Sequence, residues 1–486
     1  MVHTSANVIE EKNNLAIIEK TWEVLKECIK VVEPSKIVHI CADGVAPVAK
    51  MSQQRKRRYL SIFRQKLQSK VEPWDRNCIS PGTLFSKELN TFIKSKIREN
   101  TSKMIYSFNS CDDPGEGEHK IFTKITNLQP NEVSVIHGLD ADLIMLSLMS
   151  HKNNIYLMRE NDKGDEPYVY LDVDALRKAV LKDLQSTFTW NFKDNIIDDP
   201  YCEDAKNIIE SYVVLCFILG NDFLPHIPSL SLKNKGHERI LNAAKKIQYD
   251  EMNEMLVNHS TNTINVEMLV MILQILQNDE TQIMNTLNHE YIKKIPYQGS
   301  DEIETYPIKP ENKDLLAGLL IDKGNMWRPY YYQSLFDCHL HDTTIILNSS
   351  ELFIKGIFWT YAYYKRKPEL MVDIWYYYPY EFSPTLLDLS NYLQSSIEKW
   401  KNIEKLSSEE VDKMFVDPDV QLICILPSNS LPTHLQKYSS DSKYGLKHMF
   451  PSEYKVHTYL KTHLWECCPV LPYLDIEHIK SCLINK

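Results

Sequence analysis

The sequence lacks the glycine-rich loops by which many enzymes bind nucleotides, and it lacks long apolar runs. It contains neither G-x-x-x-x-G-K-[ST] nor G-x-G-x-x-G, which excludes a P-loop site and a dinucleotide-binding fingerprint. The longest apolar runs, such as Val213–Leu219, are far too short to cross a bilayer. We therefore expect a chain that works without a membrane.

Cysteine pairs with metal-binding spacing are also absent. The 11 cysteines are scattered, odd in number and include no C-x-x-C pair. This pattern favours reduced thiols over a disulfide framework or a zinc site. The polar start of the chain has none of the apolar character of a signal peptide. We therefore expect an intracellular protein, cytoplasmic or nuclear.

Basic residues are outnumbered overall but concentrated locally. With 55 Lys and Arg against 65 Asp and Glu, the net charge of −10 argues against indiscriminate coating of nucleic acid. The stretch Gly44–Val71 nevertheless contains Lys and Arg residues throughout and no acidic residue. A basic stretch beside an acidic cluster is what a metal-dependent site acting on phosphates requires.

Two short motifs concentrate carboxylates. In PGEGEHK, a strand or extended turn would point Glu116 and Glu118 the same way. In VSVIHGLDADLIML, an apolar run ends just before Asp140 and Asp142, which predicts an acidic tip at the carboxyl end of a buried strand. Ligands of open α/β sheets bind at such strand ends.

Two further aspartates follow apolar segments. Asp43 follows the predicted strand Lys36–Cys41, and Asp222 follows an apolar helix predicted within Ser211–Pro225. Each could instead shape a turn. Carboxylates that converge repel one another, so the pattern predicts a cation among them. Oxygen ligands without cysteine indicate Mg²⁺ or Mn²⁺.

The basic stretch predicts a helix, because Val48–Gln68 has few helix breakers and many strong helix formers. Lys50, Gln54, Arg57 and Arg58 share one face of it. Two guanidinium groups, an ammonium and an amide on one face suit the oxygens of a terminal phosphate. The alternative is a solvated basic face, but a candidate metal ligand close by in sequence favours the phosphate site.

Together the motifs resemble the Xrn family of 5′→3′ exoribonucleases, in the family's order and over almost the whole chain. The segments that carry the resemblance are ADGVAPVAKMSQQRKRR (Ala42–Arg58), NCISPGT (Asn77–Thr83), PGEGEHK (Pro114–Lys120), HGLDADLIML, LGNDFLPHIPSL (Leu219–Leu230), WYYYPYEFSP, ILPSNSLP (Ile425–Pro432) and VLPYLD (Val470–Asp475). Agreement of several long motifs in order is far more specific than any one of them.

The resemblance implies roles for individual residues. The family's acidic metal-binding positions, which would hold two Mg²⁺ or Mn²⁺ ions, match Asp43, Glu116, Glu118, Asp140, Asp142 and Asp222. The family's pocket for a 5′-monophosphate matches Lys50, Gln54, Arg57 and Arg58. His3 and Trp465 resemble the two side chains between which the family stacks bases.

The resemblance also implies a fold. We expect an α/β protein whose central, mostly parallel sheet is flanked by helices, as in PIN and flap-endonuclease-like nucleases. The expected parts are a nuclease core at 1–230, a helical connecting region at 231–350 and a second Xrn-like region at 351–486 packed on the core. The last part contains an aromatic block, Glu351–Phe382, for which packing between domains is favoured over stacking on bases.

The function implied is processive degradation of single-stranded, 5′-monophosphorylated RNA to mononucleotides by two-metal-ion hydrolysis. Two alternatives stay open: a structure-specific 5′ DNA nuclease of the flap-endonuclease type, and a catalytically impaired RNA-binding homologue. The second arises because Met1 stands just past the place of the family's N-terminal helix and first strand, which carries an aspartate. We expect those elements to be missing from this chain.

Overall fold

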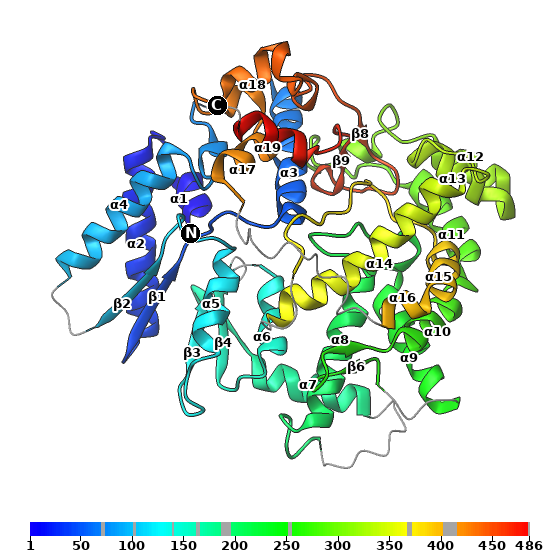
Figure 1. The fold of residues 1–486 in the computed structure, drawn as a ribbon, viewed down its shortest axis with the longest axis horizontal. Coiled ribbons are helices and arrows are strands. Elements are labelled where there is room, and N and C mark those ends of the chain that lie inside the picture. Colours follow the sequence, from blue (N-terminus) through cyan, green and yellow to red (C-terminus); the bar gives the residue numbers. More distant parts are fainter. Residues whose placement is uncertain are drawn as a thin grey trace. The chain divides into compact units, whose positions relative to one another are not determined.

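The structure, a computed structural model, describes residues 1–69, 73–100, 104–138, 140–161, 166–185, 196–250, 255–366, 372–401 and 416–484. Its backbone contacts divide the chain into two compact units. Figure 1 shows the helices and strands of the chain, coloured along the sequence. Unit 1 comprises Met1–Asp172, Val411–Glu453 and Leu471–Lys486. Unit 2 comprises Val173–Glu410 and Tyr454–Val470. The division into three parts at 230 and 350 stays a prediction.

Unit 1 begins with a parallel strand pair covered by helices. Strand β1 (Ile37–Cys41) pairs in parallel with β2 (Ile105–Asn109), so that Cys41 stands opposite Asn109. Apolar side chains of these strands pack against a core formed by three helices, α1 (Val2–Val8), α2 (Asn14–Val32) and α4 (Leu84–Glu99). The ends of both strands therefore lie together, and the segments that follow them start from one place.

A second small sheet of unit 1 has mixed directions. Strand β4 (Ile155–Glu160) pairs in parallel with β3 (Ser134–His137) and antiparallel with β5 (Tyr168–Asp172). The α/β class is thus confirmed. Among the described residues the strands of unit 1 form two separate small sheets, so one central, mostly parallel sheet stays a prediction.

Segments from the end of the chain complete unit 1. Helices α17 (Pro418–Ile425) and α19 (Ile476–Ile484) pack together, and α17 lies against α3 (Val48–Gln68), as Figure 1 shows in orange, red and blue. The buried guanidinium of Arg55, on α3, donates to the carbonyl oxygens of Met449 and Pro472, at 2.6 Å each. The basic helix is therefore fixed from its inner side by residues more than 390 positions later.

Unit 2 is mostly helical. Its longer helices are α7 (Val173–Gln185), α8 (Glu203–Ile218), α9 (Gly236–Asp250), α10 (Val266–Gln277), α11 (Glu280–Lys293), α12 (Leu316–Lys323), α13 (Trp327–Leu335), α14 (Thr343–Lys365) and α15 (Leu386–Ser395), followed by the short α16 (Ile397–Lys401). Its two antiparallel pairs join β6 (Val257–Asn258) to β7 (Thr263–Ile264) and β8 (Val456–His457) to β9 (Cys468–Pro469).

The aromatic block packs inside unit 2. The Phe358 ring stacks on Trp400 with centroids 5.2 Å apart, and Trp359 packs on Phe223 at 4.9 Å. Each of these side chains is buried. These residues are therefore packed rather than exposed as a stacking surface, but the packing lies within unit 2, so packing between domains stays a prediction.

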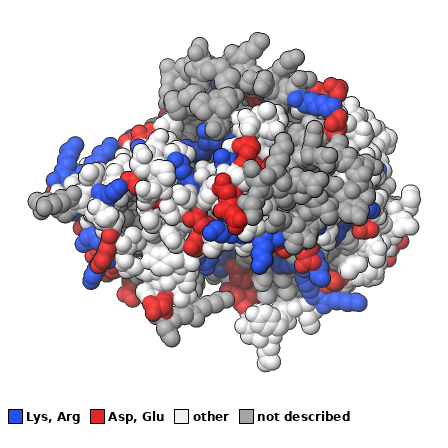
Figure 2. All heavy atoms as spheres, turned by 90° about the horizontal axis from the view of Figure 1, so that it is seen from below, with Lys and Arg blue, Asp and Glu red and all other residues white. Residues whose placement is uncertain are grey.

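The helices of the described residues are not suited to cross a membrane. Among the described residues, no helix has both the length and the apolar character needed to cross a bilayer. On the face drawn in Figure 2, acidic and basic side chains are interspersed. Both observations agree with the mixed charge of the sequence.

Candidate functional site

The acidic turn of PGEGEHK leads directly into a helix. Helix α5 (Gly117–Ile125) begins inside the motif, with Glu116 as its N-cap and Glu118 in its first turn. The expectation of a strand or extended turn was wrong here. Carboxylates are favoured at a helix N-terminus, because the unpaired N–H groups there carry partial positive charge. The two glutamates still approach each other, since their oxygens and a ring nitrogen of His119 lie within 4.8 Å.

Asp43 meets this turn at the end of β1. Its Oδ1 accepts a hydrogen bond from the backbone N–H of Gly117 at 2.7 Å. The neighbouring backbones are also joined, by Gly44 N to Gly115 O at 2.9 Å and Gly115 N to Val45 O at 2.8 Å. A Cβ at Gly44 would lie 1.8 Å from a carbonyl oxygen of the facing segment, so the close approach requires glycine. Parallel pairing of β1 and β2 thus brings Asp43 to the glutamates.

Asp140 and Asp142 come from the second sheet of unit 1. Asp140 follows β3 and is exposed, and Asp142 opens helix α6 (Asp142–Ser150). Helix α6 packs against α5. Both aspartates lie near enough to Glu118 for their charges to affect its pKa. The structure therefore brings five predicted acidic residues of unit 1 into one neighbourhood.

The electrostatics of this neighbourhood suit a divalent cation. Burial, and then the charge of Glu116, raise the pKa of Glu118 to about 9, while Lys50 opposes the shift. The Lys50 ammonium is 2.7 Å from Glu116 Oε2, and both side chains are almost fully buried. One ammonium beside several carboxylates leaves negative charge that an added cation would neutralise. Carboxylates with one imidazole are ligands that Mg²⁺ and Mn²⁺ accept, so the residues fit the implied ions.

The basic face of α3 lies beside the acidic group. Lys50 joins the two, because it stands on α3 and pairs with Glu116 on α5. Farther along, Arg58 donates from Nη2 to Ser80 Oγ at 2.8 Å. Burial, and then the charge of Arg57, lower the pKa of Arg58 to about 10. Among the described residues, the buried Arg58 Nε and Gln54 Oε1 have no hydrogen-bond partner. A buried donor without a partner favours an anion here.

The two predicted stacking residues belong to different units. His3 stands on α1 of unit 1, and desolvation, followed by the charges of the N-terminus, Arg57, Arg58 and Arg76, lowers its pKa to about 4. His3 therefore carries no charge at neutral pH and lies near the basic face. Trp465 lies in unit 2, with 68% of its surface exposed, and stacks on His463. Their joint action on a base stays a prediction.

The sixth predicted acid, Asp222, also belongs to unit 2. It follows helix α8 in a turn where Asn221 Oδ1 accepts the backbone N–H groups of Phe223 and Leu224, at 2.9 and 3.0 Å. Asn221, the residue before Asp222, therefore caps this turn. The meeting of Asp222 with the unit 1 carboxylates stays a prediction.

Three residues near the site have contacts that the sequence did not indicate. His119 lies with Glu116 and Glu118, and Ser80 holds Arg58. Lys120 is buried and bonds to three backbone carbonyl groups. The sequence hinted at each of them only through its position in the motif PGEGEHK or NCISPGT. The residue type alone does not distinguish a side chain that binds a ligand from one that holds its neighbours in place.

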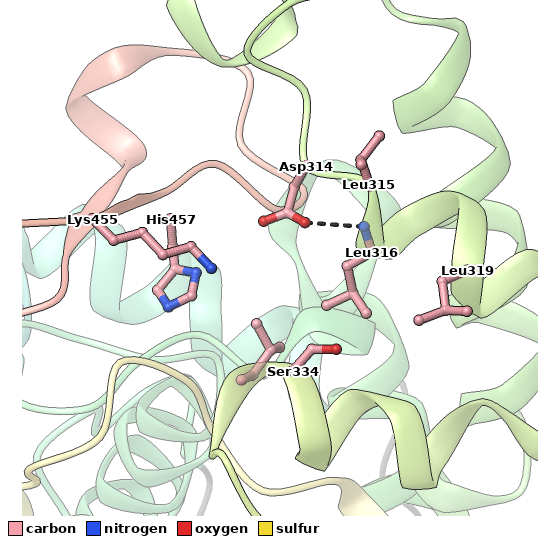
Figure 3. A pocket seen from close by; sticks show the side chains of 8 residues that line it. Asp314, Leu315, Leu316, Leu319, Ser334, Lys455 and His457 are labelled. Carbon is pink, nitrogen blue, oxygen red and sulfur yellow. Dashed lines mark hydrogen bonds between the residues drawn. The ribbon is translucent and has the colours of Figure 1, made fainter.

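Unit 2 has a separate hollow with different chemistry. It encloses about 360 Å³ and is lined by Asp314, Leu315, Leu316, Leu319, Ser334, Leu335, Lys455 and His457. Figure 3 shows the Asp314 carboxylate directed at Leu316, whose backbone N–H it accepts at 3.0 Å. Half of the lining is leucine and only one carboxylate is present, so this hollow does not suit a cluster of divalent cations.

Two family models match the chain. One, described as the XRN 5′-3′ exonuclease N-terminus, matches residues 2–161, which lie in unit 1. The other, described as the Xrn1 helical domain, matches residues 202–305 and 320–484, more than half of the chain. Together they cover most of both units.

Named relatives agree with the family models. A 5′-3′ exoribonuclease 1 of Schizosaccharomyces pombe is 24% identical over 100% of this chain. A 5′-3′ exoribonuclease 2 homolog of Drosophila melanogaster is 24% identical over 97%, and 5′-3′ exoribonuclease 1 of Homo sapiens is 25% identical over 96%. The alignments span 45%, 63% and 31% of these relatives' own lengths.

Proposed function

Since the chain belongs to the Xrn family of 5′-3′ exonucleases, we propose that it is an exoribonuclease that degrades RNA from the 5′ end. The observation that carries the proposal is the contact between Lys50 and Glu116. It joins a basic face suited to a terminal phosphate with a group of carboxylates suited to cations. A nuclease that starts at a phosphorylated end needs these two features side by side.

The acidic residues would hold the metal ions. We assign two Mg²⁺ or Mn²⁺ ions to Asp43, Glu116, Glu118, Asp140 and Asp142, with Asp222 as the contribution of unit 2. When bound, such ions would lower the pKa of a water molecule, so that hydroxide is available to attack phosphorus, and would supply positive charge for the leaving oxygen. The raised pKa of Glu118 supports this assignment, because perturbed acids gather at functional sites.

The basic residues would bind the 5′-monophosphate. Arg57 and Arg58 present forked donors, and Gln54 and Lys50 complete the same face of α3. The unpartnered Arg58 Nε is a donor that a phosphate oxygen would satisfy. Four side chains on one helix face would suit a single terminal phosphate, so we expect a triphosphate to bind less well. Holding the end in place would let the chain remove successive nucleotides without releasing the RNA.

The substrate we propose is single-stranded RNA. His3 and Trp465 would stack on bases at the 5′ end, and base stacking tolerates any sequence. Contacts to phosphate and sugar rather than base edges give little sequence preference. We propose that the chain acts inside the cell, in the cytoplasm or nucleus. The structure describes all 11 cysteines and each is a free thiol, as is usual in those reducing compartments.

Digestion of single-stranded RNA with three different 5′ ends tests the proposal. RNA with a 5′-monophosphate should disappear fastest in Mg²⁺, RNA with a 5′-triphosphate or 5′-hydroxyl should persist, and EDTA should stop the reaction. Mononucleotides should be the product. Equal cutting of all three ends would contradict the phosphate pocket, and preferential cutting of 5′-flapped DNA would indicate a flap-endonuclease-like activity instead.

A further inference from the structure

The Lys120 ammonium makes three hydrogen bonds, all within unit 1. It lies on α5, four residues after Glu116, and only 8% of the residue is exposed. Its Nζ donates to the carbonyl oxygens of Ala42 at 2.7 Å, Ser110 at 2.9 Å and Asp113 at 2.6 Å. An ammonium group has three N–H donors, so all three are satisfied by backbone. Lys120 therefore has no donor left for a substrate.

The three carbonyl groups come from the segments that carry the acidic residues. Ala42 directly precedes Asp43, at the end of β1. Ser110 directly follows β2, and Asp113 precedes the turn that leads to Glu116. One side chain thus ties the ends of both strands to the first turn of α5. Because these bonds are charge-assisted and lie at least partly out of solvent, they resist relative movement of the three segments.

The same contacts limit where Asp43 can lie. Its Oδ1 accepts the N–H of Gly117, which stands on the same helix as Lys120. Gly44 is in tight contact with the Asp113 carbonyl and lies beside Lys120 Nζ. If Lys120 lost its donors, the Ala42, Ser110 and Asp113 carbonyls would lose their charge-assisted bonds, and the three segments would be free to move apart. Asp43 and the glutamates would then lose their mutual placement.

We propose that Lys120 is a positioning residue that holds Asp43, Glu116 and Glu118 in the arrangement that binds the metal ions. The inference rests on the proposed metal site, and it assigns Lys120 no contact with RNA. Residues that support metal ligands from outside typically change metal affinity or activity by roughly 10- to 100-fold when replaced. We expect a change of that size for Lys120→Met, which keeps a long unbranched side chain and removes its donors.

The test measures Mn²⁺ binding by calorimetry on the full chain without RNA. Lys120→Met should weaken Mn²⁺ binding roughly 10- to 100-fold, and Lys120→Gln, with two N–H donors, should fall between it and wild type. Lys124→Met is the matched control, because it stands on the same helix one turn farther from Glu116, and it should bind like wild type. In digestion, the Lys120 variants should need more Mg²⁺ and keep the preference for a 5′-monophosphate.

The outcomes separate this inference from the proposed function. If wild type binds no Mn²⁺, the metal site itself fails. If wild type binds Mn²⁺ and both Lys120 variants bind it equally well, Lys120 has only a role in stability and the inference is wrong. A lower melting temperature with unchanged Mn²⁺ affinity would contradict the inference in the same way. If Lys120→Met does not fold, Lys120→Gln and its Mn²⁺ affinity decide.

Discussion

Buried charges are arranged differently in the two units. In unit 2, Glu210 is fully buried, and its carboxylate accepts from Tyr361 at 2.8 Å and pairs with Lys365 and His259. In unit 1, Glu118 lies among other carboxylates, and burial with their charges raises its pKa to about 9. The first carboxylate is surrounded by donors, whereas the second is surrounded mostly by groups of its own sign.

The difference indicates what each group of charges does. A buried carboxylate with partners on several sides fixes the segments that supply them, here α8, α14 and the residue that follows β6. Buried like charges destabilise a fold unless something else binds there, and such groups are typical of functional sites. Substitutions should therefore affect stability in unit 2 and activity in unit 1.

The largest effect should come from Asp140→Asn in unit 1. Loss of one carboxylate from the proposed metal site should remove several kcal/mol of transition-state stabilisation, about 10³-fold in the rate of RNA hydrolysis. Because Asp140 is exposed, the free energy of unfolding should change by about 0.5 kcal/mol or less. Digestion rates and urea unfolding measure both. Glu19→Asn, at an exposed position on α2, is the control, and equal loss of activity there would remove the contrast.

A substitution in unit 2 should cost a comparable free energy, but as a loss of stability rather than of activity. Lys365→Met leaves Glu210 buried without its ammonium partner, which should cost about 3–5 kcal/mol of unfolding free energy. Lys355→Met, on the same helix, breaks the partly exposed pair with Asp373 and should cost about 1 kcal/mol or less. Urea titrations of both variants measure the difference. Equal losses would show that burial of the pair does not matter.

A smaller effect on activity should follow from Arg58→Ala. The proposed charge-assisted contact to the terminal phosphate would be lost, so the preference for a 5′-monophosphate over a 5′-hydroxyl should fall about 10- to 100-fold. Cleavage of 5′-hydroxyl RNA should change little, because the residues of the proposed metal site are unaltered. Competition between the two RNAs measures the ratio. Lys56→Ala, also on α3, should keep the preference, and a loss of similar size there would favour a diffuse basic surface.

The smallest effect should be a change with pH in unit 2. Burial raises the pKa of Glu280 from 4.5 to about 7, against hydrogen bonds from Leu386 N and Leu387 N. The folded chain then binds this proton more tightly than the unfolded chain, so Glu280 lowers stability as pH rises from about 4.5 to 7. Glu280→Gln should therefore be more stable than wild type at pH 8, by about 1–3 kcal/mol, and similar at pH 4.5.

Urea unfolding at the two pH values checks this prediction. Glu290→Gln, at an exposed position of the same helix, should show no such dependence. An unchanged difference between Glu280→Gln and wild type at both pH values would mean that the Glu280 carboxylate keeps its ordinary pKa in the folded chain.

Much of the fold could be predicted because it depends on local patterns. The helix Val48–Gln68 follows from its many helix formers and few breakers, and it matches the structure. The strand before Asp43 follows from its apolar run. The start of α5 was missed, because a Pro-Gly turn followed by alternating glutamates fits a strand as well as a helix N-terminus.

By itself the sequence determined the residue types of the site and the elements on which they stand, because side-chain periodicity is a property of one segment. It placed Lys50 and Arg58 on one face of a helix and Asp43 at the end of a strand. Only the tertiary structure decided that Lys50 pairs with Glu116 and that Lys120 bonds to three separate segments. Those contacts depend on parallel pairing of strands far apart in the chain, which no local pattern specifies.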